Sequence, residues 1–167
     1  MTVLVTGAAG FIGSHVSHAL LDRGEEVLGL DNLYEYYDPK LKQARLERLE
    51  ARKGFKFVFA DIGRVQALEA AVAPALGSID RIVHLAAQAG VRYSIDHPQT
   101  YLQSNYAGHL NMLELARKTA GPIFHSVFQS ALRVGKRVRE KTGMDQGKLS
   151  VASVAVDHAR EVFDTFT

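Results

Sequence analysis

TVLVTGAAGFIG, residues 2–13, decides the fold of this chain. Its apolar start, Val3–Val5, predicts a short buried strand, and its three glycines predict a tight turn into a helix that ends at Gly24. The next apolar run, Val27–Leu30, predicts a second strand that ends at Asp31. This order of strand, glycine loop, helix, strand and acid is typical of a nucleotide-binding βαβ unit. In such a unit the main chain approaches a pyrophosphate, and the carboxylate accepts hydrogen bonds from an adenosine ribose.

The alternation of strands and helices continues to about residue 118. Apolar periodicity predicts two more strands, at Phe55–Ala60 and Arg81–Leu85, and three more helices, over residues 38–53, from Val65 to near Pro74, and over residues 98–118, with a loop at residues 86–93. Because strands joined by right-handed helical crossovers form parallel sheets, the predicted strand order is 3-2-1-4. The predicted class is α/β, a Rossmann-like parallel sheet with helices on both faces, followed by two C-terminal helices. We expect a nucleotide-binding domain at residues 1–118 and a helical extension at residues 119–167.

Composition excludes several other classes of protein. A chain of 167 residues with 47% hydrophobic residues is long enough to bury a core of its own. It contains no cysteine, which excludes disulfides, Cys-ligated metals and thiol catalysis. No apolar run approaches the ~20 residues of a membrane span, so we expect a soluble, cytoplasmic protein with no membrane partner. His15 and His18 share a predicted helix without a third ligand, so we expect no metal site.

Charge divides the chain into two parts. Residues 1–116 contain 11 Lys/Arg and 13 Asp/Glu, whereas residues 117–167 contain 9 and 5. The basic residues of the second part gather in the run 133–141, at helical spacing. We interpret this run as a solvated helix face, so nucleic acid is not an expected partner.

Four motifs in residues 1–116 resemble the opening part of an extended short-chain dehydrogenase/reductase, and closely that of nucleotide-sugar epimerases of the UDP-glucuronate 4-epimerase type. They are TGAAGFIGSH (6–15), LDNLYEYYDPKLKQARL (30–46), the pair Asp61-Ile62, and HLAAQAGVRYS (84–94) together with Ser104-Asn105. The resemblance implies that residues 1–118 are a truncated NAD-binding Rossmann domain, with NAD as the cofactor and a nucleotide-sugar as the family's substrate. It further implies NAD-dependent 4-epimerase (isomerase) activity for the family.

The same resemblance assigns residues to the cofactor. It places Gly7, Gly10, Phe11, Ile12 and Gly13 at the pyrophosphate, Asp31 and Asn32 at the adenosine ribose, Asp61 and Ile62 at the adenine, and Leu85, Ala86, Ala87 and Gln88 on the nicotinamide side. Arg92 and Tyr93 are implied to face the sugar nucleotide. An acid at position 31, with no Arg beside it to receive a 2′-phosphate, favours NAD over NADP.

No catalytic residue is assigned. The family transfers a hydride from the sugar's C4 to NAD and back, using a Tyr and a Lys four positions later as the base. In the family this pair lies on the helix after the fifth strand, and we expect no such strand or helix beyond Ala116. The match Tyr36 to Lys40 falls in the loop after the second strand, where we interpret it as coincidence. We therefore expect a catalytically incomplete protein. The alternatives are a structural or assembly protein with a vestigial nucleotide site, and a functional epimerase.

Residues 121–167 resemble a different family. GPIFHSVFQSALRVGKRVREKTGMDQGKLSVASVAVDHAREVF, which begins at Gly121, is similar to a helical segment of glutamyl-tRNA reductase. A junction near Ala116 to Ala120 suggests a recombined or engineered chimera, with a natural fusion as the alternative. We expect helices at residues 122–141 and 150–166. Together with the helix at 98–118, their apolar faces predict a homodimer.

Overall fold

The computed structural model describes residues 1–36 and 38–119, which all lie within the first of the two units into which the chain divides, Met1–Gly121. The expectations for residues 120–167 lie outside the described residues. They are the basic run at 133–141, the helices at 122–141 and 150–166, and the resemblance to glutamyl-tRNA reductase. The domain boundary at residue 118 stays a prediction.

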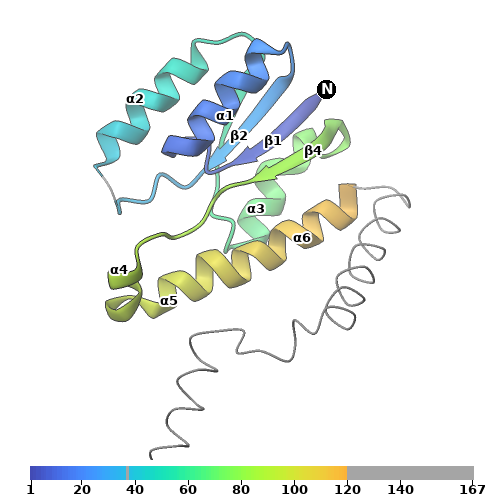
Figure 1. Ribbon diagram of the computed structural model, residues 1–167. Coiled ribbons are helices and arrows are strands. Elements are labelled where there is room, and N and C mark those ends of the chain that lie inside the picture. Colours follow the sequence, from blue (N-terminus) through green and yellow to red (C-terminus); the bar gives the residue numbers. More distant parts are fainter. Residues whose placement is uncertain (37, 120–167) are drawn as a thin grey trace, which may run out of the picture. The chain divides into compact units, whose positions relative to one another are not determined.

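Four parallel strands form one sheet (Figure 1). They are β1 (Thr2–Thr6), β2 (Glu26–Asp31), β3 (Phe55–Phe59) and β4 (Ile79–His84). Their order is β3-β2-β1-β4, which confirms the predicted order 3-2-1-4. Thr6 pairs with Leu30 on one side and with His84 on the other, so the carboxyl ends of these strands meet at one edge of the sheet.

Helices cover both faces of the sheet. Their bounds are α1 (Phe11–Asp22), α2 (Pro39–Glu50), α3 (Val65–Val72), a 3₁₀ turn (Ala73–Ser78), α4 (Val91–Asp96), α5 (Pro98–Tyr101), a π-helical turn (Leu102–Ala107) and α6 (Gly108–Thr119). In Figure 1, α1 and α2 lie on one face, and α3 and α6 lie on the other. None of the helices among the described residues is long and apolar enough to cross a membrane.

The core has two halves because side chains alternate along each strand. On one face Val3, Val5 and Val27 pack with Leu21 of α1 and Leu49 of α2. On the other face lies the second cluster, which contains Leu4, Leu28, Leu30, Leu68, Val72, Met112 and Leu115. Strands buried on both faces explain why the apolar runs in β1 and β2 are continuous in the sequence.

Two local features differ from the sequence prediction. The predicted loop at residues 86–93 ends early, because Gly90, with φ of +103°, turns the chain into the short helix α4. The predicted helix at 98–118 forms, but its backbone widens into a π-helical turn at Leu102–Ala107. Such turns are rare, and they often lie next to functional sites.

Candidate functional site

A pocket of about 390 Å³ lies where the carboxyl ends of the strands meet. Among the predicted cofactor residues, those that line it are Gly7, Gly10, Phe11, Asp31, Asn32, Ile62, Leu85, Ala86, Ala87 and Gln88. The first and last of these residues, Gly7 and Gln88, lie 81 positions apart in the sequence. This edge is where parallel α/β sheets bind their ligands.

The glycine loop forms one wall of this pocket. Gly7 has φ of +73°, and a Cβ there would lie 3.0 Å from the backbone N of Ala86, so only glycine fits. Gly10 precedes α1 without a side-chain cap, which leaves the helix's first N–H groups available to an anion. Gly13 does not line the pocket. A Cβ at Gly13 would lie 2.0 Å from Gly7 O, so this glycine allows α1 to pack against the loop.

Ile12 also lies away from the pocket. Its side chain is exposed (63%), as is that of its neighbour Phe11, which does reach the pocket wall. The buried face of α1 contains Gly13, Ser14, Ser17 and Leu21.

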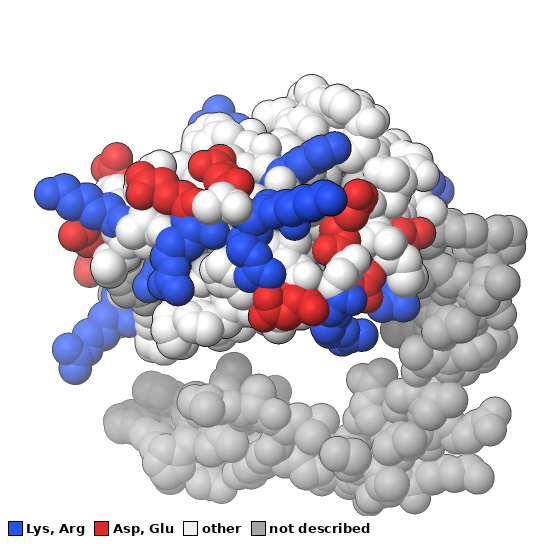
Figure 2. Space-filling view, turned by 90° about the horizontal axis from the view of Figure 1, so that it is seen from above, with Lys and Arg blue, Asp and Glu red and all other residues white. Residues whose placement is uncertain are grey.

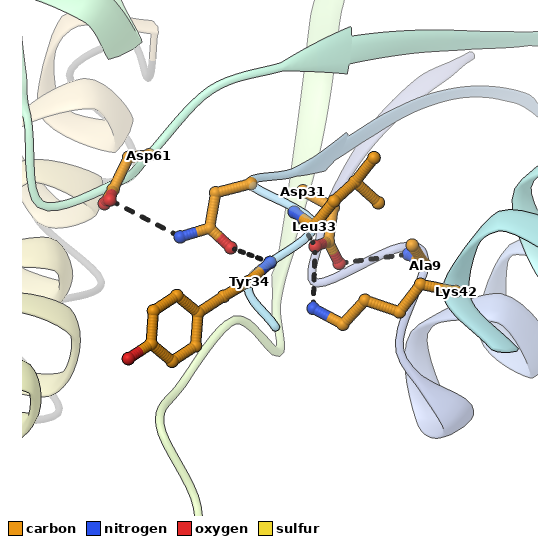
Figure 3. Close-up of polar contacts among 7 residues, drawn as sticks. Ala9, Asp31, Leu33, Tyr34, Lys42 and Asp61 are labelled. Carbon is orange, nitrogen blue, oxygen red and sulfur yellow. Dashed lines mark hydrogen bonds and ion pairs between the residues drawn. The ribbon is translucent and has the colours of Figure 1, made fainter. Parts of the chain in front are cut away.

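Asp31 is buried at the end of β2 and has several hydrogen-bond partners (Figure 3). Its Oδ2 accepts from Ala9 N at 3.1 Å, and its Oδ1 accepts from Leu33 N at 2.8 Å. Oδ1 also receives the Lys42 ammonium at 3.1 Å, in an ion pair whose side chains are 5% and 15% exposed. The carboxylate is therefore held in one position between the glycine loop and α2.

Lys42 was not predicted as a site residue, although it lines the same pocket. Arg45, one helical turn further along α2, also lines it and lies over the Phe11 ring, with 5.8 Å from its guanidinium carbon to the ring centroid. The spacing of Lys42 and Arg45 places both on one helix face, which was the available sequence signal. The sequence argument considered only an Arg beside Asp31, whereas α2 brings Lys42, 11 positions away, onto the carboxylate and places Arg45 on the wall of the same pocket.

Asn32 and Asp61 link the ends of β2 and β3. Asn32 Nδ2 donates to Asp61 Oδ2 at 3.4 Å, and Asp61 Oδ1 accepts from Gly63 N at 2.8 Å. Asp61 itself does not line the pocket, whereas its neighbour Ile62 does. The backbone carbonyl of Ile62 accepts from Asn111 Nδ2 at 2.7 Å, so α6 holds this loop in place.

The opposite end of the pocket depends on bonds from side chains to backbone. Asn105, in the π-helical turn, accepts from Gln88 N at 2.7 Å and donates to Gln88 O at 2.9 Å. Thr6 Oγ1 accepts from Leu85 N and from Ala86 N, both at 3.1 Å. Thr6, Asn105 and Asn111 position the pocket without lining it, and the sequence assigns none of them this role.

Tyr93 lies outside the main pocket. It belongs to an aromatic group in which its hydroxyl lies 2.9 Å from that of Tyr34 and its ring centroid 4.8 Å from that of Tyr36. The hydrogen bond with Tyr34 raises the pKa of Tyr93. Tyr93 lines a second, open hollow of about 640 Å³ together with residues 32–36. Arg92 is exposed and lines neither cavity.

The remaining candidates have structural partners. Tyr36 lines the main pocket, whereas Lys40 lies in the first turn of α2, where its N–H donates to the capping Asp38 at 2.9 Å. His15 donates to Phe11 O at 2.7 Å, and His18 Nδ1 lies 3.3 Å from Arg52 Nη1. Within residues 1–36 and 38–119 no group of three or more His, Asp or Glu side chains could hold a metal ion.

Figure 2 shows the face of the molecule that carries α1 and α2, where basic and acidic side chains are interspersed. Some of them pair, as Arg52 does with Asp22 at 2.6 Å. Over this face the basic residues of α2 do not form a patch of a single sign. The absence of a nucleic-acid partner stays a prediction.

A parallel sheet with a glycine loop and a buried acid at the ends of adjacent strands defines a Rossmann-like α/β protein. Comparison with known sequences then identifies the family. Residues 4–131 match the family model described as GDP-mannose 4,6 dehydratase, and the chain belongs to this family.

Individual relatives support the resemblance to epimerases. The chain is 51% identical over 117 residues to UDP-glucuronate 4-epimerase 4 of Arabidopsis thaliana, which covers 70% of this chain and 26% of the relative. It is 47% identical over 120 residues to the probable UDP-glucuronate 4-epimerase of Rhizobium meliloti (strain 1021). That match covers 72% of this chain and 35% of the relative. The chain therefore spans about a quarter to a third of the length of these curated relatives.

Among solved structures, the fold is similar to that of UDP-glucuronic acid 4-epimerase from Bacillus cereus in complex with UDP-glucuronic acid and NAD. The TM-score is 0.62 and the sequence identity 37%, and the match covers 70% of this chain and 36% of that one. This similarity confirms the predicted Rossmann-like fold and the likeness of the N-terminal region to UDP-glucuronate 4-epimerases.

Proposed function

We propose that residues 1–119 bind NAD as the cofactor-binding part of a UDP-glucuronate 4-epimerase-like protein. The observation that carries this proposal is the buried Asp31 carboxylate, which lies in the same pocket as Gly7 and Gly10. A fixed carboxylate opposite a glycine loop suits a ribose and the pyrophosphate attached to it. The Bacillus cereus relative, solved with NAD, matches this part of the chain.

The proposed contacts follow the two ends of the pocket. Gly7, Gly10, Phe11, Ile12 and Gly13 form the pyrophosphate side, with Ile12 acting through its backbone and Gly13 through packing. Asp31, Asn32, Asp61 and Ile62 hold the adenosine, and Leu85, Ala86, Ala87 and Gln88 face the nicotinamide. Arg92 and Tyr93 face the nucleotide-sugar, and of these two Tyr93 lines the second hollow.

The preference for NAD over NADP depends on Asp31. Its two oxygens already accept bonds from the glycine loop, from Leu33 and from Lys42, so the carboxylate cannot turn away from a 2′-phosphate. Repulsion between the Asp31 carboxylate and the 2′-phosphate disfavours the binding of NADP. The ion pair with Asp31 leaves little of the Lys42 charge to attract the phosphate. Arg45 remains the cation that could offset this repulsion.

Calorimetric titration of NAD, ADP-ribose and NADP into the full chain tests the proposal. We expect NAD and ADP-ribose to bind with dissociation constants within about tenfold of each other, a difference of at most ~1.4 kcal/mol, and NADP to bind more weakly. Asp31→Asn should weaken NAD binding, whereas the matched exposed variant Asp22→Asn should not. NADP binding as tight as NAD, or no effect of Asp31→Asn, would contradict the role of Asp31.

We propose that the 167 residues do not catalyse epimerisation on their own. A positioned acid–base group contributes about 10²–10⁴-fold to a rate. Tyr36, the tyrosine of the one Tyr-x-x-x-Lys match, lines the pocket, whereas Lys40 does not line it and its backbone N–H donates to the capping Asp38. Incubation with UDP-glucuronate and NAD should give no UDP-galacturonate. Turnover that Tyr36→Phe abolished would instead assign catalysis to Tyr36.

An assembly role is the second candidate function. The helix formed by residues 98–119 exposes large apolar side chains at near-helical spacing, namely Leu102, Tyr106, Leu110 and Leu113. We propose that this stripe is buried in a homodimer, since burial of apolar surface drives association. Sedimentation of the purified chain should show a dimer, and a stable monomer at micromolar concentration would contradict it. A dimer that retained no NAD would favour the assembly role over cofactor binding.

We also propose that residues 121–167 have a separate origin, as their resemblance to glutamyl-tRNA reductase suggests, and that the protein is cytoplasmic. The family match ends at residue 131, which leaves 36 residues unmatched and overlaps the proposed segment by eleven. Sequencing the source locus across residues 110–131 distinguishes a chimera from a continuous family member. Cell fractionation tests the location.

A further inference from the structure

Thr6 and His84 end neighbouring strands and face each other beneath the pocket. The two residues are paired in the sheet register, and the Thr6 side chain is fully buried. Thr6 Oγ1 lies 2.7 Å from His84 Nδ1. The same oxygen accepts from Leu85 N and Ala86 N, both at 3.1 Å. One hydroxyl therefore has three polar neighbours.

Counting protons determines the state of the imidazole. A threonine hydroxyl has one proton to donate and two lone pairs that accept. The N–H groups of Leu85 and Ala86 both donate to Thr6 Oγ1, that of Leu85 being shared with Thr6 O at 3.3 Å, so His84 Nδ1 is the acceptor that the geometry offers to the hydroxyl proton. A nitrogen that accepts this proton carries no hydrogen of its own. His84 is then neutral, with its proton on Nε2.

We propose that His84 is a positioning residue, which as the neutral Nε2–H imidazole orients the Thr6 hydroxyl and thereby holds residues 85–86 against the glycine loop. The contact is close, because a Cβ at Gly7 would lie 3.0 Å from both Ala86 N and the Leu85 carbonyl carbon. Gly7, Leu85 and Ala86 all line the main pocket. His84 does not line it and acts through Thr6.

The surroundings of His84 favour the neutral form. Burial lowers the pKa of His84 below its usual 6.5, and the charge of His109 lowers it further. His109, on α6, stacks on His84 with ring centroids 5.4 Å apart. Within the described part of the chain, His109 is the one titratable group whose charge acts on His84, and β1 contributes only the neutral Thr6.

Protonation of His84 would disrupt this arrangement. An imidazolium presents a third N–H donor to Thr6 Oγ1 and leaves the hydroxyl proton without its acceptor. The bonds from Leu85 N and Ala86 N to Thr6 Oγ1 then weaken, while Leu85 N keeps its bond to Thr6 O. Residues 85–86 should loosen in acid, and the affinity for NAD should fall with them. This last step rests on the proposed function, whereas the assignment of the tautomer does not.

The tautomer is measured directly by ¹⁵N NMR of the full chain with labelled histidine, without any ligand. We expect His84 to show an unprotonated Nδ1 and a protonated Nε2 at pH 7.5. Assignment of the signal by its loss in His84→Asn removes ambiguity. Finding Nδ1–H, or an imidazolium at that pH, would overturn the proposal whether or not NAD binds.

Titration of NAD at pH 7.5 and pH 5.5 tests the consequence. Loss of one neutral hydrogen bond, about 1 kcal/mol, corresponds to an affinity up to roughly fivefold weaker at the lower pH, the full loss being reached where His84 is protonated. In His84→Asn, Asn Oδ1 can still accept the Thr6 proton but does not titrate, so the fivefold change should disappear. The variant His84→Leu should bind NAD more weakly than His84→Asn at both pH values.

Two further outcomes complete the test. His109→Gln removes the charge that opposes protonation of His84, so the loss of affinity should move to higher pH. An unchanged pH dependence in His84→Asn would overturn the link between His84 and binding. If no variant binds NAD at either pH, the proposed function fails, and the NMR result alone then decides the role of His84.

Discussion

The two ends of the pocket are built from different interactions. At the adenosine end, a buried carboxylate is held by backbone N–H groups and by an ammonium, as Asp31 is by Ala9, Leu33 and Lys42. At the nicotinamide end, neutral side chains hold the backbone, as Thr6 and Asn105 do at residues 85–88. Beyond that end lies α4, whose apolar side chains Val91 and Ile95 are 85% and 76% exposed.

Losing a charged partner and losing a neutral partner have different energetic costs. A buried ion pair stabilises the fold only while both partners are present, because either charge left alone keeps its desolvation cost. A neutral side chain that bonds the backbone contributes about 1 kcal/mol per bond and leaves a smaller penalty when it is lost. The adenosine end should therefore respond strongly and asymmetrically to mutation, and the nicotinamide end weakly.

The largest effect is expected from breaking the ion pair at Asp31. Asp31→Leu leaves the Lys42 ammonium, only 15% exposed, without its partner and two backbone N–H groups without their acceptor. We expect a loss of about 3 kcal/mol in the free energy of unfolding, measured by urea denaturation.

Lys42→Met is the matched control for that prediction. It leaves Asp31 with the N–H groups of Ala9 and Leu33, so it should cost clearly less than Asp31→Leu. Equal losses for the two variants would show that the carboxylate is not stabilised by the backbone, and the proposed asymmetry would be wrong.

A smaller effect is expected from Asn105→Ala, at the nicotinamide end. The change removes both bonds to Gln88, and we expect a loss of about 2 kcal/mol in unfolding free energy.

Asn111→Ala is its counterpart at the adenine end and removes the bond to Ile62 O. Calorimetry should show that Asn111→Ala weakens ADP-ribose and NAD alike, whereas Asn105→Ala leaves ADP-ribose binding intact. If Asn105→Ala weakened ADP-ribose binding and Asn111→Ala did not, the adenosine and nicotinamide ends of the pocket would be assigned the wrong way round.

The fold could be predicted from the sequence because its signals are local. Continuous apolar runs mark strands buried on both faces, such as β1 and β2, and at the sheet edge Gly7 follows β1 and Asp31 ends β2. Right-handed crossovers then leave a single strand order to expect. The unpredicted helix α4 is six residues long and buries no side chain, so it leaves no apolar pattern in the sequence.

The site could be predicted only where a residue lines the pocket within a motif. Lys42 was missed because its contact with Asp31 depends on how α2 packs, which spacing within a helix does not define. Asn105 was identified by resemblance without a role, since the π-helical turn that aims it at Gln88 has no sequence signal. Gly13 belongs to the motif but serves packing, a difference that only the 2.0 Å approach to Gly7 O reveals.

The pH dependence of stability should be a modest effect, seen at the nicotinamide end. The pKa of His84 is lowered in the folded chain, so the unfolded chain binds more protons in the range between the lowered pKa and 6.5. The free energy of unfolding therefore rises with pH through that range and falls as the pH drops below 6.5. Urea unfolding at pH 5.5 and 7.5 should show a smaller difference in His84→Asn than in the wild type. An equal difference would assign the pH dependence to other groups.

The smallest effect is expected at α4. Val91→Ser and Ile95→Ser change side chains that are almost fully exposed, and α4 buries none of its residues. Each substitution should alter the free energy of unfolding by no more than about 0.5 kcal/mol, because exposed positions contribute little to the folded state. Val58→Ser, at a partly buried position packed against the core, is the matched control and should cost more. If Val91→Ser or Ile95→Ser destabilised the purified chain as much as Val58→Ser does, α4 would be buried in solution by another surface. The nicotinamide end would then be supported by apolar packing as well as by Thr6 and Asn105.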